Sequence, residues 1–387
     1  MFDGQLESDG PPTEEQLTAV PAKRGVLALL DGSGRPITLL TAADIRARLR
    51  TRLRPQPEDS PTKTADLRQI TRKVLWKLTW SHFETDLCFL EFARAIRPGK
   101  YASLLAWRQA WFVHVNASET FPRFRRTRDV RRRDGLMLGP FGHSRDCGTF
   151  MEIMHDAFSL CRDYSRLLQA PHGQPCAYAQ MGRCPSVCNG NITVAEYRAM
   201  VAEAADYAAG RRQGLRDGLQ QRMRTAAEAF QFEAAGRIKA RLDRLADLDG
   251  RGYEYVAPLE AFRFILVHRG RSGRQANVFH VAGGSVVAGK PLGFPLCDEQ
   301  LVAALGEMSA HVAADHPFGQ AETWRIGLVT RYLFSSVERR GVILRWGADL
   351  TAEALRRAIL AAAEPLKLRA SKRTANSNGA QGKRGKE

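Results

Sequence analysis

The sequence has no run of 18 or more apolar residues, so no segment is long enough to cross a membrane as a helix. Its first residues, MFDGQLESDGPPTEEQ, are acidic and do not have the composition of a signal or transit peptide. Acidic residues are scarce in the whole chain: 41 Asp and Glu stand against 58 Lys and Arg, a formal charge of +17. We therefore expect a cytoplasmic protein, without a membrane partner, that binds nucleic acid.

Cysteine is also scarce, and its odd number, seven, argues against a disulfide framework in a cytoplasmic chain. Three cysteines stand apart and are expected to be small buried hydrophobic residues: Cys88, Cys147 and Cys297. The other four have the spacing C-x14-C-x7-C-x3-C: Cys161, Cys176, Cys184 and Cys188. Zinc sites usually contain close cysteine pairs, whereas four separated thiolates suit an iron–sulfur cluster. From the spacing alone the two metals are about equally supported, and either would be structural.

The order of helical and strand-like patterns predicts an α+β multidomain protein. Two apolar runs around Asp-Gly-Ser-Gly predict a hairpin over 25–40, followed by a helix with Thr41 as its N-cap. The expected units are a flexible leader (1–22), an α/β module (23–104), a basic and cysteine-containing region (105–200), a helical segment (205–249), a C-terminal α+β domain (252–365) and a disordered basic tail (366–387).

Arginines alternate with aromatic residues in WRQAWFVHV and FPRFRRTRDVRRRD, between Trp107 and Asp134. In a chain of this charge, the segment is expected to contact DNA phosphates, although a solvated surface loop is an equal alternative. The candidate DNA-binding residues are Arg123, Arg125, Arg126, Arg128, Arg131, Arg132 and Arg133.

The segment Leu219–Leu248 has an apolar stripe along one helical face and charges on the other. It predicts two antiparallel helices around AFQF, or one long helix. Such a small element must pack on its own chain or on a partner helix. Beyond it, FRFILVHRG, ANVFHVAGG, TWRIGLVTRYLF and GVILRW are strand-like, and His268 and His280 are expected to be satisfied strand histidines.

Four segments resemble UvrC, the incision subunit of bacterial nucleotide excision repair, and occur in that family's order. PCAYAQMGRCPSVCNG resembles its cysteine-rich segment, and LGPFGHSRDCGTFMEIMHDAFSLC the stretch before the first cysteine. HFETDLCFLE resembles a helix of its GIY-YIG nuclease module, and AFQFEAAGRIKARL its UVR motif. The resemblance implies a 4Fe–4S cluster on the four cysteines. It also implies docking to a UvrB-like protein through Phe230, Phe232, Glu233, Ala235 and Ile238.

The same resemblance assigns a catalytic arginine to Arg48 and the ligand of one Mg²⁺ or Mn²⁺ to Glu91. The motif tyrosines are missing, because Leu27 and Thr38 stand in their places and the first tyrosine is Tyr101. The module is therefore expected to be a degenerate nuclease, with Glu91 an ordinary helix residue. The UVR motif also departs from the family at Gly236 and Ala240, so packing of this segment on the C-terminal unit is an equal alternative to docking.

The first functional hypothesis is a UvrC-like DNA-binding protein of nucleotide excision repair with impaired or lost nuclease chemistry. The alternative is an active metal-dependent excinuclease that makes a single incision beside lesions through Arg48 and Glu91. A third reading is an iron–sulfur protein that senses oxidants on DNA. The C-terminal unit, in which an RNase H-like remnant is one reading, receives no catalytic residue because no strand carboxylates are found in it.

Overall fold

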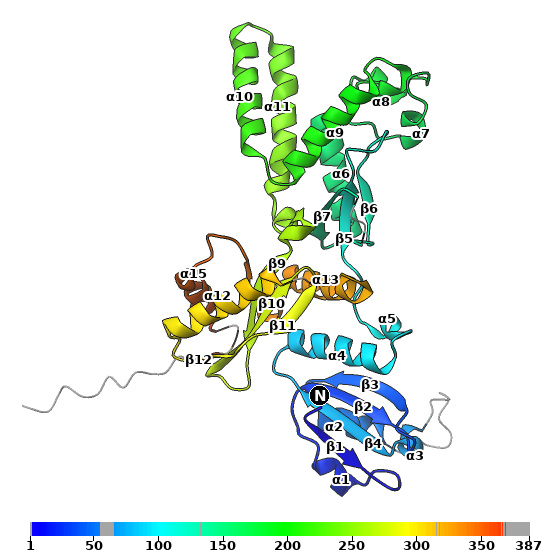
Figure 1. Cartoon of the computed structure of the whole chain (residues 1–387), viewed down its shortest axis with the longest axis vertical. Coiled ribbons are helices and arrows are strands. Elements are labelled where there is room, and N and C mark those ends of the chain that lie inside the picture. The colour runs from blue at the N-terminus through cyan, green and yellow to red at the C-terminus, as the bar shows by residue number, and fades with distance from the viewer. Residues whose placement is uncertain are drawn as a thin grey trace, which may run out of the picture.

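The computed structural model describes residues 2–54, 66–131, 134–314, 316, 318–364, 366 and 368. The chain is a mixture of helices and antiparallel sheets, as the α+β prediction required. Figure 1 shows the units arranged along the long axis of the molecule. The N-terminal sheet lies at one end, the C-terminal sheet lies in the middle, and the cysteine region and a helical hairpin form the other end.

The N-terminal sheet has the strand order β1-β4-β2-β3, with all described pairs antiparallel. Its strands are β1 (Gly4–Glu7), β2 (Gly25–Leu30), β3 (Pro36–Ala42) and β4 (Lys73–Leu78). Helices α1 (Glu14–Thr18) and α2 (Ile45–Arg52) pack on one face through Leu17, Ile45 and Leu49. Helix α4 (His82–Ile96) belongs to the core on the other face, and the short helices α3 (Leu67–Ile70) and α5 (Tyr101–Leu104) flank the module.

Two local predictions for this module were wrong. The leader is not flexible, because β1 pairs with β4, and Leu17 and Val20 are buried in the module's core. Its acidic residues cover only the outward side of these elements, so the composition hid the few apolar residues that fix them. The N-cap of α2 is Asp44, since Thr41 is still in β3, where it pairs with Val26.

The middle region combines the sheet β6-β5-β7-β8 with two long helices. Its strands are β5 (Trp111–Val115), β6 (Arg125–Thr127), β7 (Leu136–Phe141) and β8 (Ala257–Pro258). Helices α6 (Ser144–Phe158) and α9 (Val194–Ala208) share one apolar core with the sheet. Between them lie α7 (Tyr164–Leu167), α8 (Ala177–Gln180) and a 3-10 turn over Val187–Asn189, in the segment that contains the four candidate cysteines.

Helices α10 (Gln213–Glu228) and α11 (Phe232–Ala246) form the predicted antiparallel hairpin and project from the middle region (Figure 1). Leu219 and Leu245 are buried at its base, where α11 packs on α6. The hairpin therefore packs on the middle region. The alternative that it packs on the C-terminal unit is wrong.

The C-terminal unit has the antiparallel sheet β11-β10-β9-β13, with β12 on the edge of β10. Its strands are β9 (Arg263–Arg269), β10 (Gln275–Ala282), β11 (Ser285–Ala288), β12 (Leu292–Gly293) and β13 (Val342–Arg345), and none of these described strands carries Asp or Glu. Its helices are α12 (Asp298–Ala313), α13 (Gln320–Leu333), α14 (Val337–Arg340) and α15 (Ala352–Ala361).

The end of this unit lies further along the chain than residue 365, where the sequence placed it. Leu366 and Leu368 are buried in the same core as Leu355 and Ile359. The disordered tail was thus predicted to begin too early, because basic neighbours outweighed two leucines in its composition. Residues 369–387 lie outside the described residues.

Helix α13 was predicted to be a strand because its sequence is apolar on nearly every side. It is a central helix, buried around most of its circumference, so neither a helical nor a strand period is visible in its sequence. The indole of Trp107 donates to the carbonyl of Trp324 at 3.2 Å, and the Tyr332 hydroxyl donates to Asp86 at 2.8 Å. Helix α13 therefore joins the C-terminal unit to both α4 and the segment that leads into the middle region.

Candidate functional site

The four candidate cluster cysteines lie on one side of the middle region, in the segment between α6 and α9. Cys161, Cys184 and Cys188 are buried, and Cys176 is half-buried in front of α8. The Cys161 thiol donates to the carbonyl of Asp163 at 3.3 Å, and its interaction with the neighbouring Cys184 thiol raises the pKa of Cys161 and lowers that of Cys184. Cys188 is near enough that its charge also raises the pKa of Cys161. Cys161 and Cys184 are therefore neighbours, and Cys188 lies within electrostatic reach of Cys161.

The fourth cysteine, Cys176, follows a segment that contacts the turn containing Cys188. The Cys188 thiol donates to the carbonyl of Gln174 at 3.7 Å, and the amide of Gly173 donates to the carbonyl of Cys188 at 2.7 Å. These contacts hold the chain before Cys176 against the Cys188 turn. Within the described residues, no three Cys, His, Asp or Glu side chains are arranged as a finished metal site. A soft thiolate donor set is nevertheless of the kind that iron–sulfur clusters and zinc take.

The three remaining cysteines differ from one another. Burial raises the pKa of the Cys88 and Cys147 thiols to about 12, so both are protonated, unreactive residues of apolar surroundings. Cys297 is exposed in front of α12, so the prediction that it is buried was wrong. Its position in a loop gave no apolar pattern from which burial could follow.

The candidate nuclease residues are not brought together. Glu91 accepts from Arg94 Nη1 at 2.9 Å and from Arg325 Nε at 2.8 Å, so each of its oxygens is held by a guanidinium group. Burial would lower the pKa of Arg325, but Glu91 and Glu322 outweigh it and raise the pKa. Arg48 is exposed on α2, which covers the opposite face of the sheet from α4.

The position expected for the first motif tyrosine is closed by the core. Leu27 is fully buried and packs with Ile45 and Leu49 beneath α2. Gly25 is retained for a packing reason, because a Cβ there would lie 2.3 Å from the carbonyl oxygen of Lys77 on β4. Gly25 is thus required for the close pairing of β2 with β4.

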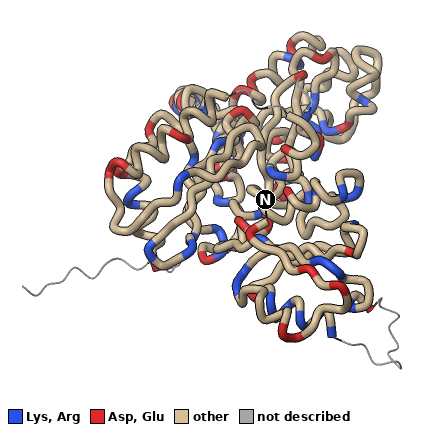
Figure 2. The backbone as a smooth tube through the Cα atoms, turned by 60° about the horizontal axis from the view of Figure 1, so that its bottom comes forward, with Lys and Arg blue, Asp and Glu red and all other residues tan. Residues whose placement is uncertain are grey.

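The arginine segment is partly occupied by contacts within the chain. Arg123 stacks on the Tyr164 ring at 3.5 Å, Arg128 stacks on Trp111 at 4.3 Å, and Arg125 is paired with Glu119. Arg126 and Arg131 are exposed, but Arg126 donates to the Ser144 hydroxyl at 3.0 Å and Arg131 is paired with Asp129 at 2.8 Å. Arg132 and Arg133 lie outside the described residues. Figure 2 shows that Lys and Arg occur in every unit and are interspersed with Asp and Glu.

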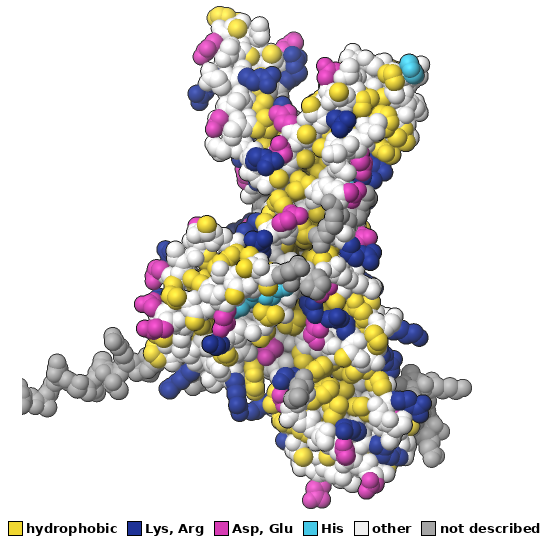
Figure 3. All heavy atoms as spheres, viewed as in Figure 1, with side chains coloured by type: hydrophobic (Ala, Val, Ile, Leu, Met, Phe, Trp, Pro, Cys, Tyr) yellow, Lys and Arg dark blue, Asp and Glu magenta, His cyan; other side chains and the backbone are white. Residues whose placement is uncertain are grey.

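The hairpin exposes two aromatic rings at its tip. Phe230 is 80% exposed and Phe232 67% exposed, and the ring centroids are 6.0 Å apart in an edge-to-face arrangement. Apolar atoms are visible at this free end in Figure 3. Glu233 is exposed and Ala235 is half-buried, whereas Ile238 packs into the middle-region core. Ile238 is therefore not a free partner-binding residue, because the base of the hairpin uses it.

Asp156 is a residue of functional interest that the sequence analysis missed. Asp156 on α6 accepts from Arg183 at 2.5 Å and from Arg244 at 3.3 Å, and it is also paired with Arg162. Burial would raise the pKa of Asp156, but these arginines outweigh it and lower the pKa. The carboxylate joins α6, the cysteine loop and the hairpin base, which are distant in sequence, so no local pattern could reveal it.

His268 and His280 are buried strand residues, as predicted. However, the Nε2 atom of each has no hydrogen-bond partner within the described residues, so they are not fully satisfied. No described helix is long and apolar enough to span a membrane.

Comparisons with known proteins find matches to the middle region and to longer parts of the chain. A family model of the UvrC/Cho excinuclease middle domain matches residues 110–207. The UvrABC system protein C of Moorella thermoacetica is 26% identical over 280 residues, which are 71% of this chain and 44% of that protein. For Rhodospirillum rubrum the identity is 24% over 271 residues, 69% and 42% of the two chains. No solved structure matches the chain significantly.

The match places the cysteine loop, α6 and α9 in an excinuclease-type middle domain. These matches support a divergent member of the UvrC family. The chain spans less than half the length of these two curated relatives.

Proposed function

We propose that this protein is a DNA-binding protein of nucleotide excision repair that acts without a working GIY-YIG nuclease centre. The observation that carries the second half of the proposal is the pairing of Glu91 with Arg94 and Arg325. A carboxylate whose two oxygens are both hydrogen-bonded to guanidinium groups must break those bonds before it can hold a divalent cation. The missing motif tyrosine, replaced by the buried Leu27, supports the same conclusion.

The cysteine loop is proposed to hold a 4Fe–4S cluster on Cys161, Cys176, Cys184 and Cys188. The contact between the first and third thiols, the proximity of Cys188 and the adjoining segment before Cys176 fit such a group. When bound, the cluster would tie the loop to α6 and so stabilise the surface beside the hairpin. To stabilise the loop, the cluster needs only the four cysteine thiolates as ligands, with no open coordination position.

The hairpin is proposed to dock on a UvrB-like protein through Phe230 and Phe232. Large apolar side chains with this exposure are uncommon in a monomer and are typical of binding hot spots. Glu233 and Ala235 adjoin them, whereas Ile238 supports the hairpin from below. Docking through the tip leaves the packing of the base on α6 unchanged.

DNA binding is tested by the salt dependence of affinity for a lesion-bearing duplex, measured with the full chain by fluorescence anisotropy. Replacing the exposed Arg126 and Arg131 with Gln should reduce the log–log slope by roughly 1.8, because each phosphate contact contributes about 0.9. Replacing Arg123 and Arg128, which stack on Tyr164 and Trp111, should reduce the slope less. A wild-type protein whose affinity for DNA is negligible at low salt would refute the proposal.

The alternative of an active single-incision excinuclease keeps one observation in its favour. The side chain of Arg48 is exposed and makes no hydrogen bond or ion pair within the described residues, so it is available for a phosphate. It would require Glu91 to exchange Arg325 for Mg²⁺ or Mn²⁺ when DNA binds. Metal-dependent cleavage separates the two functions.

A further inference from the structure

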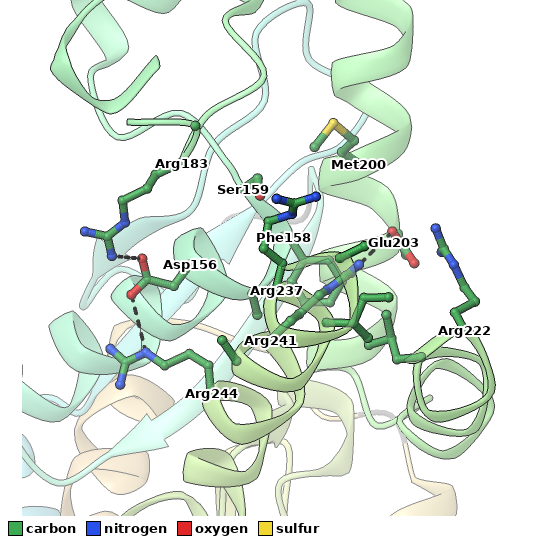
Figure 4. Close-up of a pocket in the computed structure, with 16 residues that line it drawn as sticks. Asp156, Phe158, Ser159, Arg183, Met200, Glu203, Arg222, Arg237, Arg241 and Arg244 are labelled. Atoms are coloured by element: carbon green, nitrogen blue, oxygen red, sulfur yellow. Dashed lines mark hydrogen bonds and ion pairs between the residues drawn. The ribbon is translucent and has the colours of Figure 1, made fainter. Parts of the chain in front are cut away.

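The hairpin and the cysteine region enclose a cleft of about 750 Å³ between them (Figure 4). Its walls come from five places: the end of α6, the cysteine loop, α9, α10 and α11. Five arginines line it, namely Arg183, Arg222, Arg237, Arg241 and Arg244, against the two carboxylates Asp156 and Glu203. The lining therefore carries an excess of three positive charges, which attracts an anion into a partly enclosed space.

Three of these arginines already have partners. Arg183 and Arg244 are held by Asp156, and Arg241 stacks on Phe158 at 4.8 Å with Glu203 3.9 Å away. Arg222 on α10 and Arg237 on α11 are exposed and make no hydrogen bond, ion pair or ring contact within the described residues. Figure 4 shows Arg183 and Arg222 on opposite sides of the cleft. The unpaired cations are thus on the hairpin, facing a wall whose charges are compensated.

The floor between the arginines is apolar, with Phe158, Met200 and Leu219 among its residues. A small inorganic anion would satisfy one cation and leave this floor uncovered. A strand of nucleic acid has phosphates along one side and flat apolar bases along the other, so it fits a cationic rim over an apolar floor. Guanidinium forks, which provide all five cations here, also suit phosphate oxygens.

We propose that the cleft between the hairpin and the cysteine loop binds a single-stranded stretch of DNA, with Arg222 and Arg237 on its phosphates. The proposal rests on the DNA-binding function proposed above and adds a second contact region, separate from the arginine segment. A strand in the cleft would touch both the hairpin that carries the aromatic tip and the loop that carries the cysteines. Single-strand binding would therefore fix the hairpin relative to the middle domain.

The test uses the full chain and a short oligothymidylate labelled with a fluorophore, with a duplex measured in parallel. The variant Arg222→Gln/Arg237→Gln removes the two unpaired cations without breaking a contact of the fold. Its matched control, Arg224→Gln/Lys239→Gln, makes the same charge change on exposed positions of the same two helices that do not line the cleft. Thermal melting should be the same for all three proteins.

We expect the slope of log affinity against log salt for the oligothymidylate to fall by about 1.4 in the cleft variant, because each single-strand phosphate contributes about 0.7. The control variant should keep the wild-type slope. Equal slopes in the two variants, with duplex binding retained, would overturn the cleft proposal and leave the proposed function standing. An unchanged slope combined with weaker binding of a partner protein would show that an acidic peptide occupies the cleft, which also overturns it. If the wild-type protein binds neither the oligothymidylate nor the duplex, the proposed function is refuted.

Discussion

In the N-terminal module, Glu91 is held between two arginines and Leu27 is buried in the core, whereas in the middle region and its hairpin the side chains of Arg222 and Phe230 are exposed to solvent. Polar groups that contact a ligand must lose water or internal partners when they bind, so a binding surface favours groups that are not already paired. The contrast supports the proposals that the N-terminal module is a scaffold and that ligands bind to the middle region and hairpin.

The largest expected effect concerns the cysteine loop. Cys184→Ala should abolish binding of the proposed cluster and unfold much of the loop, since the binding free energy of a structural metal, about 10 kcal/mol for zinc fingers, is folding free energy. Iron content, visible absorbance and thermal melting measure this. Cys297→Ala, at an exposed cysteine outside the loop, is the control and should change none of them. A soluble, fully coloured Cys184→Ala protein would contradict the assignment.

Removing the hairpin tip should weaken partner binding almost as strongly. Phe230→Ala/Phe232→Ala should lower the affinity for a UvrB-like protein by roughly 100-fold or more, because each buried aromatic hot spot contributes about 2 kcal/mol or more. Calorimetric titration measures the affinity, and Gln231→Ala, at the exposed position between the rings, is the matched control. Unchanged affinity in the double variant would mean that another surface docks the partner.

Acid should weaken the joint between the N-terminal module and the C-terminal unit. His268 stacks on Phe83 of α4 with ring centroids 5.0 Å apart, and burial, with a smaller effect of His82, lowers its pKa to about 3. Its ordinary pKa is about 6.5, so the neutral ring contributes full stability above pH 6.5, and that stability is lost as the pH falls toward 3. Between pH 6.5 and 5 the free energy of unfolding should fall by about 2 kcal/mol because of His268.

Thermal melting against pH measures this loss. His268→Leu should show a smaller fall in melting temperature between pH 6.5 and 5 than the wild type, whereas a variant of the exposed His172, His172→Gln, should follow the wild type. If the His268→Leu and wild-type curves are parallel, the joint is not the acid-sensitive part of the fold.

The smallest expected effect is the loss of stability when the ion pair between Glu91 and Arg325 is removed. Glu91→Gln and Arg325→Gln should each lower the free energy of unfolding by about 1 kcal/mol, and the double variant by less than the sum, because the pair is partly exposed. Urea unfolding of the four proteins of this cycle gives the coupling. Additive effects would mean that the pair does not hold Glu91 in place.

The sequence predicted the elements whose pattern is local: the hairpin over 25–40 and the helical hairpin α10–α11. It failed where burial is decided by distant segments. Helix α13 was taken for a strand because units on several sides of it bury its whole surface. Leu17 and Leu366 were assigned to flexible ends because their neighbours are polar, although each completes a core formed by residues far away in the chain.

The candidate sites followed the same division. The exposed phenylalanines could be predicted from the motif, but the partners of Glu91 and Asp156 come from helices and loops far away in the sequence. Arg325 is 234 positions from Glu91, and Arg244 is 88 positions from Asp156. Only the fold shows that the first carboxylate is a structural anchor and that the second joins the hairpin to the cysteine region.

The most direct measurement is incision of a lesion-bearing duplex, labelled at either end, with Mg²⁺ or Mn²⁺, in the presence and absence of UvrA and UvrB. We expect the full chain to bind this duplex without cutting it, and the Glu91→Ala protein to behave in the same way apart from a small loss of stability. Metal-dependent cleavage that disappears with Glu91→Ala would contradict this. It would show that Glu91 breaks its ion pair with Arg325 and acts in an active nuclease centre.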